Sequence, residues 1–216
     1  MKLPDDLRAR IGGNVRPVRP LLAPWKRALL LVPAALLAWA ATPGVLGLRG
    51  DLLNVGSLLG WGGSIVQLCI AVALIAAALR EAIPAESLPG SWARLLLLSG
   101  AVIAIGLALA INVVSPEPFG RTETFQDWLY CWRGGVVGGL PLLIVLIVLL
   151  ARGLPSRPAL AGALAGMGTG GAVDGGWRLS CNYSNPSHVI PSHVGAVLAL
   201  TLLGIAAVIL IAKIRK

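Results

Sequence analysis

The chain has 216 residues, of which 56% are hydrophobic and only 12% are charged, and its mean hydropathy is +0.83. This composition is typical of membrane proteins and excludes a soluble domain with a polar surface. The net charge of +9 would suggest binding to nucleic acid, but the basic residues lie at the ends of apolar stretches, where membrane topology places them.

A basic tail comes first and occupies residues 1–26. Its first part predicts a short amphipathic helix, which Gly12-Gly13 ends, and the prolines that follow favour an extended linker. Such a helix is suited either to the groove of a partner protein or to a lipid surface. The residues predicted to bind a partner are Leu3, Asp5, Asp6, Leu7 and Ile11.

Six apolar stretches follow the tail, and a transmembrane helix needs about 20 residues of this kind. The predicted spans are residues 28–48, 52–79, 95–114, 134–151, 158–177 and 194–212. The sequence therefore predicts an all-α membrane protein, with a bundle of six transmembrane helices and short loops over residues 27–216. No separate catalytic domain fits in the remaining length.

The fifth predicted span is unusually rich in glycine. Gly162, Gly166 and Gly170 recur four residues apart, a spacing that lets a helix approach its neighbours closely in a membrane. Asp174 and Arg178 are also four apart and are predicted to pair on one helix face. A structural ion pair is preferred to a proton or ion relay, because no second ionisable residue within the spans continues a path.

The distribution of basic residues predicts the orientation of the bundle. With six spans, one side receives both tails and the second and fourth connections, which together hold fourteen of the 18 Lys and Arg residues. Because basic loops stay on the cytoplasmic side, both termini are predicted to be cytoplasmic.

The three cysteines fall into two groups. Cys69 lies within the second span, where a free thiol usually packs as a small apolar group. Cys131 and Cys181 lie near the outer ends of spans, on the side where a bacterial envelope is oxidising.

Both histidines of the chain, His188 and His193, follow Cys181. Thiolate and imidazole together suit zinc and its heavier relatives, although the spacing matches no standard zinc motif. Three interpretations stay open at this point. The first is a structural disulfide between Cys131 and Cys181, the second is a redox- or metal-responsive cluster of all four residues, and the third is a set of unrelated loop residues.

Catalytic signatures are missing from the sequence. It contains no HExxH motif, no serine–histidine–acid grouping and no glycine loop placed to hold a phosphate. We therefore predict that the protein is not an enzyme. A transporter is also disfavoured, because the spans contain few of the polar residues that line substrate pathways.

Several short motifs occur in a set order along nearly the whole chain. In order they are Asp5-Asp6-Leu7, Gly47-Leu48-Arg49-Gly50-Asp51-Leu52, Cys131 ten residues before Pro141, Arg157-Pro158, and then Cys181, His188 and His193 before a last span with a basic end. Their order resembles the NrsF family of bacterial membrane-bound anti-sigma factors. The chain departs from the family pattern where Pro191-Ser192 precedes His193 in place of an aromatic residue.

The resemblance implies a multi-pass protein of the bacterial inner membrane that holds an extracytoplasmic-function sigma factor and releases it under stress from heavy metal or oxidant. It implies that Cys131 and Cys181 are the sensing positions, with His188 and His193 as possible further ligands. No resident cofactor and no direct binding of nucleic acid are expected, only a transient heavy-metal ion. The alternative is a small envelope carrier of metal or electrons that uses the same cysteines, and a scaffold subunit without sensing is a third hypothesis.

Overall fold

The computed structural model describes residues 22–83, 87–114, 124–153 and 155–215. The predicted partner-binding residues of the tail, from Leu3 to Ile11, lie outside these ranges. Within them the chain is helical and contains no strand.

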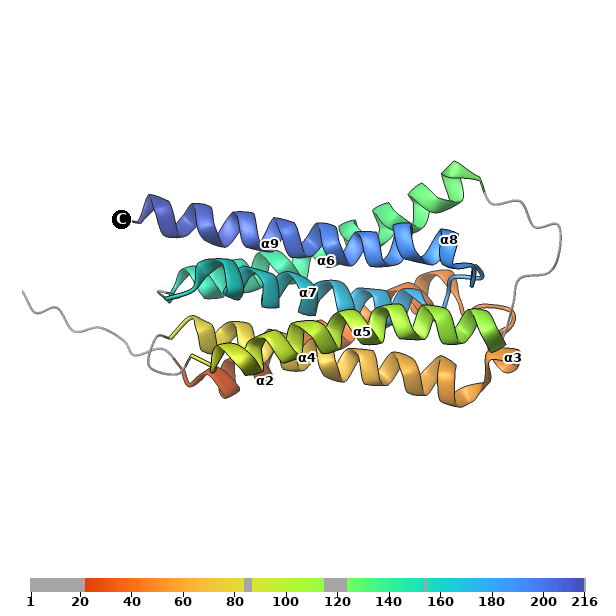
Figure 1. Cartoon of the computed structure of the whole chain (residues 1–216), viewed down its shortest axis with the longest axis horizontal. Coiled ribbons are helices and arrows are strands. Elements are labelled where there is room, and N and C mark those ends of the chain that lie inside the picture. Colours follow the sequence, from red (N-terminus) through yellow and green to blue (C-terminus); the bar gives the residue numbers. More distant parts are fainter. Residues whose placement is uncertain (1–21, 84–86, 115–123, 154, 216) are drawn as a thin grey trace, which may run out of the picture.

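Six long helices run side by side along the longest axis of the molecule (Figure 1). They are α2 (Pro24–Leu46), α4 (Gly63–Glu81), α5 (Gly90–Val114), α6 (Phe125–Ala151), α7 (Pro158–Trp177) and α9 (Gly195–Ile214). Two are preceded by shorter turns: α3 (Leu52–Ser57) and the π-helical turn η1 (Leu58–Gly62) precede α4, and α8 (Pro186–Val189) and the π-helical turn η3 (Ile190–Val194) precede α9. The predicted all-α bundle is thus confirmed.

Five of the six helical segments in the described ranges are long and apolar enough to cross a membrane: Pro24–Leu46, Leu52–Glu81, Gly90–Val114, Phe125–Ala151 and Pro186–Ile214. Helix α7 is not among them, because its glycines lower its hydropathy. Its predicted bounds, residues 158–177, are nevertheless those of the helix.

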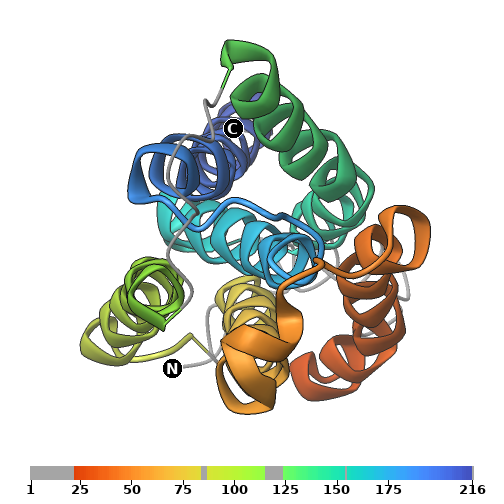
Figure 2. The same cartoon turned by 90° about the vertical axis from the view of Figure 1, so that its right-hand side faces the viewer.

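Helix α7 lies at the centre of the bundle, and the other long helices surround it (Figure 2). Fourteen of its 20 residues are buried, which explains how a helix of low hydropathy can be the core of a membrane bundle. Its neighbours cover it with apolar side chains, so its own surface is selected for close packing and not for contact with lipid.

The predicted glycine spacing has a direct structural role. A Cβ atom added at Gly162 or Gly166 would lie under 3.0 Å from the backbone of α9, at Gly204 and Leu200 respectively. Real Cβ atoms essentially never come so close to other atoms. The two helices therefore lie backbone against backbone, without side chains between them.

One predicted helix start is wrong. Helix α6 begins at Phe125, nine residues before the predicted residue 134, whereas α9 begins at Gly195, one residue after the predicted residue 194, and further helical turns precede it from Pro186. At the start of α6, Thr124 accepts a hydrogen bond from the Asp127 backbone while the Asp127 side chain accepts one from the Thr124 backbone. This capping box fixes the start in spite of a polar, aromatic first turn.

The second predicted span is also less regular than expected. The structure divides residues 52–81 into α3, η1 and α4, and Gly56 within α3 has a φ of +80°. Only glycine adopts this conformation at little cost, so the chain changes direction there.

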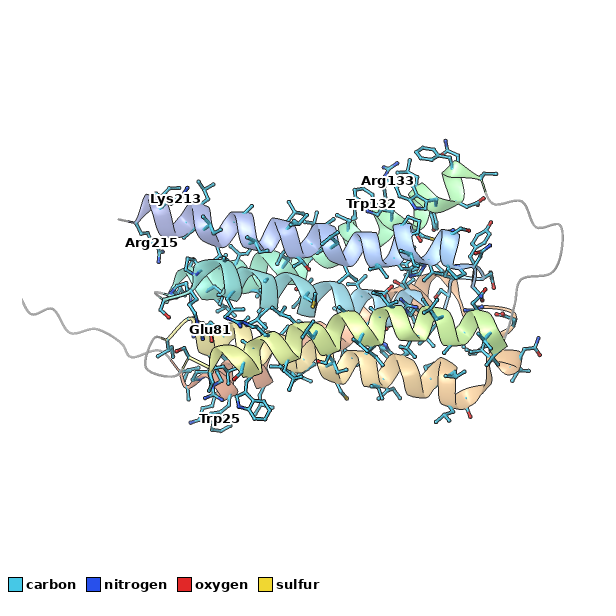
Figure 3. All side chains as sticks on the ribbon, in the orientation of Figure 1. Trp25, Glu81, Trp132, Arg133, Lys213 and Arg215 are labelled. Carbon is cyan, nitrogen blue, oxygen red and sulfur yellow. The ribbon has the colours of Figure 1, made fainter. Side chains whose placement is uncertain are left out.

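Both ends of the described chain lie at the same end of the bundle (Figure 1). Figure 3 shows Trp25, Glu81, Lys213 and Arg215 at that end, and Trp132 and Arg133 towards the other. Tryptophan and basic residues prefer the boundary between membrane and water. These labelled side chains therefore mark two levels that fit the two faces of a bilayer.

The thiol of Cys69 does not pack inside the bundle. Its side chain is exposed on α4, and the expectation that it is a buried packing group is wrong. Cys69 thus lies on the outer surface of the bundle, unlike Cys131 and Cys181, which are buried.

Candidate metal centre

Four soft or borderline ligand side chains meet at the end of the bundle away from the described termini. Cys131 comes from α6, Cys181 from the loop after α7, His188 from α8 and His193 from η3. All four are buried, and their ligand atoms lie within 4.8 Å of one another. The hypothesis of unrelated loop residues is therefore wrong, and the sequence-predicted residues form one cluster.

Distances within the cluster are those of neighbours in contact. The sulfur atoms of Cys131 and Cys181 are 3.9 Å apart, and the Cys181 sulfur is 3.7 Å from Nε2 of His188. Both cysteines are free thiols in this structure. The ring of Tyr183 stacks on that of His188, with the ring centroids 4.4 Å apart.

The π-helical turn explains how the two histidines share one face. Residues five apart lie on nearly opposite faces of an α-helix, because each residue turns the helix by about 100°. In η3 the backbone N–H of Gly195 bonds to the carbonyl of Ile190, which is the wider i to i+5 spacing. Pro191 has no N–H for the regular ladder, and the widened turn brings His193 towards His188.

The loop that carries Cys181 is fastened to the end of α2. The backbone N–H of Arg49 donates to the Leu179 carbonyl at 2.8 Å, and its guanidinium donates to Ser184 Oγ at 2.8 Å and to both oxygens of Asp51. The motif around Arg49 in the sequence thus positions the ligand loop.

Behind the cluster lies a buried polar network centred on Asp174. One oxygen of Asp174 is 2.8 Å from Nδ1 of His193, and the other accepts hydrogen bonds from Gln67 at 2.6 Å and Arg178 at 2.8 Å. The predicted pair of Asp174 and Arg178 is confirmed. Arg178 also donates to the Ala104 carbonyl at 2.8 Å, so the network joins α4, α5, α7 and η3.

One nitrogen in this network has no partner. Because an ionised carboxylate only accepts hydrogen bonds, Nδ1 of His193 carries a proton, and in the neutral form of the ring Nε2 then presents a lone pair. That Nε2 is buried and has no hydrogen-bond partner among the described residues. A cavity of about 10 Å³, lined by Cys131, Asp174 and His193, lies beside it, with room for little more than one atom.

The thiol of Cys181 is less acidic than an ordinary cysteine. The contact with the Cys131 sulfur and burial together hold the pKa of the Cys181 thiol well above its usual range. The protonated form of this thiol is therefore favoured.

Sequence reasoning found the four ligand residues but missed what lies behind them. It paired Asp174 with Arg178 alone and did not connect it to His193, and it gave no role to Gln67. The sequence signal that could have pointed to Gln67 is weak. It is a single polar side chain within an apolar span, and such a side chain usually has a buried polar partner.

Comparison with known families gives a single result. The family described as "Negative regulator of sigma F", NrsF, matches residues 12–213. Neither the comparison with curated proteins nor that with solved structures finds a match. The matched range covers all six long helices and the four cluster residues, so the chain belongs to the NrsF family of negative regulators of sigma F.

Proposed function

We propose that this chain is an anti-sigma factor of the bacterial inner membrane that sequesters an extracytoplasmic-function sigma factor and releases it on envelope stress. Membership of a family of negative regulators supports the sigma-factor partner and a regulatory, non-catalytic role. The observation that carries the sensing part is the buried cluster of Cys131, Cys181, His188 and His193.

The orientation follows from charge. Eight basic residues lie close to the helix ends at which the described chain begins and finishes. They are Lys26, Arg27, Arg80, Arg94, Arg152, Arg157, Lys213 and Arg215. The opposite end has Arg49, Arg133 and Arg178 among the described residues, and two of these pair with buried or half-buried acids. The basic end is assigned to the cytoplasm and the cysteine cluster to the periplasmic side.

The cytoplasmic tail is the proposed binding element for the sigma factor. Leu3, Leu7 and Ile11 recur at helical spacing and would supply the apolar contacts, with Asp5 and Asp6 beside them. The bundle holds this tail at the membrane surface, which keeps a bound sigma factor away from RNA polymerase.

Signal transmission is assigned to the central helix. Asp174 near one end of α7 contacts His193, and Arg157 at the other end is hydrogen-bonded to Glu81. A change in the cluster that moves α7 or α9 therefore reaches the cytoplasmic end through closely packed backbone. For release, the signal must bind or modify one arrangement of the bundle in preference to the other.

The first test is co-purification of sigma factors with the detergent-solubilised protein. We expect one extracytoplasmic-function sigma factor to be retained by the full chain, and to be lost from a variant without residues 1–25 and from the full-length variant Leu7→Glu. If the full chain retains no sigma factor, the anti-sigma function is refuted. If the variants retain it as well as the full chain does, the tail is not the binding element.

The second test concerns the cysteines. Cells that carry Cys131→Ser together with Cys181→Ser should keep the sigma factor bound on challenge with cadmium or oxidant. Cys69→Ser is the matched control, because this thiol is exposed and does not belong to the cluster, and it should leave release unchanged. Normal release by the double variant would rule out sensing by this pair.

A further inference from the structure

The separations between ligand atoms in the cluster are close to those around a bound cation. In a tetrahedral zinc site, bond lengths of about 2.3 Å to sulfur and about 2.0 Å to nitrogen place two sulfur ligands roughly 3.8 Å apart and a sulfur and a nitrogen roughly 3.5 Å apart. Two separations in the cluster are 3.9 Å and 3.7 Å, and all four ligand atoms lie within 4.8 Å of one another, so the widest pair would shorten by about 1 Å on binding.

The fourth ligand is prepared in the same way. Nε2 of His193 is buried and unpartnered, while its Nδ1 is held by Asp174. A carboxylate on the far nitrogen of a ligating histidine fixes the ring orientation and makes the free nitrogen more basic, as at many metal sites. An unpartnered buried nitrogen is otherwise unfavourable, because it loses its hydrogen bond to water on folding.

We propose that Cys131, Cys181, His188 and His193 bind one divalent cation of the zinc and cadmium class in a closed tetrahedral site, and that Asp174 is the positioning residue for His193. This inference rests on the proposed sensing function and names the signal that the cluster receives. Two thiolates and two imidazoles favour such cations over magnesium and calcium, which prefer oxygen ligands.

The binding step changes protons but not oxidation states. The cation forms two bonds to sulfur and two to nitrogen and loses water from its own shell. Any protons on the two thiols leave to solvent, and the thiolate charges neutralise the cation. Four protein ligands leave no open position for a substrate, so the site is a structural or sensory site and not a catalytic one.

Asp174 also connects the cation to the bundle. The hydrogen bonds from Gln67 and Arg178 tie this carboxylate to α4 and, through the Ala104 carbonyl, to α5. A cation bound to Nε2 of His193 would shift the ring, and the contact of Nδ1 with Asp174 would transmit that shift to the carboxylate. Occupancy of the site is thereby linked to the packing of the central helix.

The experiment uses the reduced, full-length protein in nanodiscs, with Co²⁺ as a spectroscopic probe and Zn²⁺ as competitor. One equivalent of Co²⁺ should produce the intense visible bands of a tetrahedral site and a thiolate charge-transfer band, and Zn²⁺ should abolish both. Cys131→Ser with Cys181→Ser should remove the charge-transfer band.

The Asp174 part is tested by Asp174→Asn, which keeps the size of the side chain and removes its charge. We expect the affinity for Zn²⁺ to fall by about 10–100-fold while the tetrahedral bands persist. Ser99→Ala is the control: the Ser99 hydroxyl also makes a hydrogen bond, but to the Leu96 carbonyl of its own helix and not to the network around Asp174. The affinity of this variant for Zn²⁺ should equal that of the unmodified protein.

The outcomes separate the hypotheses. If the unmodified protein binds no Co²⁺ but oxidant joins Cys131 to Cys181, the metal site is refuted while sigma-factor co-purification still tests the proposed function by itself. If Asp174→Asn binds Zn²⁺ as tightly as the unmodified protein, the positioning role is refuted. Should Asp174→Asn not fold, Asp174→Glu keeps the charge but shifts the carboxylate relative to Nδ1 of His193, and an unchanged affinity for Zn²⁺ in that variant would equally refute the role.

Discussion

The two ends of the bundle each bury a carboxylate beside an arginine, but they differ in what remains free. At the end that holds the described termini, both oxygens of Glu81 are bonded to Arg157, and one also accepts from the Leu88 backbone. At the end that holds the cysteine cluster, Asp174 is equally satisfied, but it holds a histidine whose other nitrogen has no hydrogen-bond partner among the described residues.

This difference teaches how similar interactions serve different purposes. A buried carboxylate must be paired, because an isolated charge in a dry interior is strongly unfavourable. Around Glu81 the pairing is complete, so that end holds two loops together. Around Asp174 the pairing extends to His193, one of the four residues of the cluster, so that end offers the side chains of the proposed metal site.

Removal of the Arg157 side chain, which pairs with Glu81, should have the largest effect on stability. Arg157→Ala leaves the charge of Glu81 buried without its partner, and we expect the free energy of unfolding to fall by about 3 kcal/mol or more. Reversible unfolding in mixed micelles, followed by tryptophan fluorescence, measures this loss. The exposed neighbour is the control: Arg152→Ala should change stability by less than about 0.5 kcal/mol.

Binding of Zn²⁺ to the cysteine cluster should stabilise the protein by a comparable amount. Free Zn²⁺ at 100 times its dissociation constant should raise the free energy of unfolding by about 2.7 kcal/mol, and a chelator should reverse the gain. The gain should persist in Arg157→Ala and vanish in Cys181→Ser. A gain that survives the loss of Cys181 would show that zinc acts elsewhere.

The backbone contact between α7 and α9 is common to both ends, and a single methyl group should weaken it. Gly166→Ala would force the two helices apart, with an expected loss of about 1–3 kcal/mol. At Gly106, on the exposed face of α5, an added Cβ meets nothing within 4 Å. Gly106→Ala should therefore be neutral or slightly stabilising, and equal effects at the two glycines would contradict the close contact.

The smallest effect is expected at the start of α6, the helix that carries Cys131. Thr124→Ala removes the side chain of the capping box and should cost about 1 kcal/mol, seen as faster hydrogen exchange in the first turn of the helix. Thr124→Ser keeps the hydroxyl and should restore the slower exchange. No difference between the two variants would mean that the cap does not stabilise this turn.

Much of the fold could be predicted from hydropathy, and the bounds of α7 could be predicted from Pro158 at its start and its glycine spacing. The starts of α6 and of the last helical segment could not, because hydropathy does not register a cap such as Thr124 or a proline at a first helical position such as Pro186. Because helical turns begin earlier than predicted at both places, Cys131 and both histidines lie on helical turns and not in loops.

The candidate site was predictable in its ligands but not in its support. The chain has only three cysteines and two histidines, so the candidate metal ligands could be chosen from a small set of residues. The contact between Asp174 and His193 joins residues 19 positions apart, and it depends on a π-helical turn that changes which residues share a face. Spacing rules for regular helices cannot produce such a contact.

The length of α6 has a consequence for how the site is reached. Its 27 residues span about 40 Å, whereas the hydrocarbon layer of a bilayer is about 30 Å thick. When Ala151 lies at one boundary of the layer, the other boundary lies near Cys131, about 20 residues earlier. An ion on that side of the membrane can therefore approach the buried thiols without crossing the hydrocarbon. A thicker bilayer would submerge them, so lipid composition is expected to set access to the site alongside ion concentration.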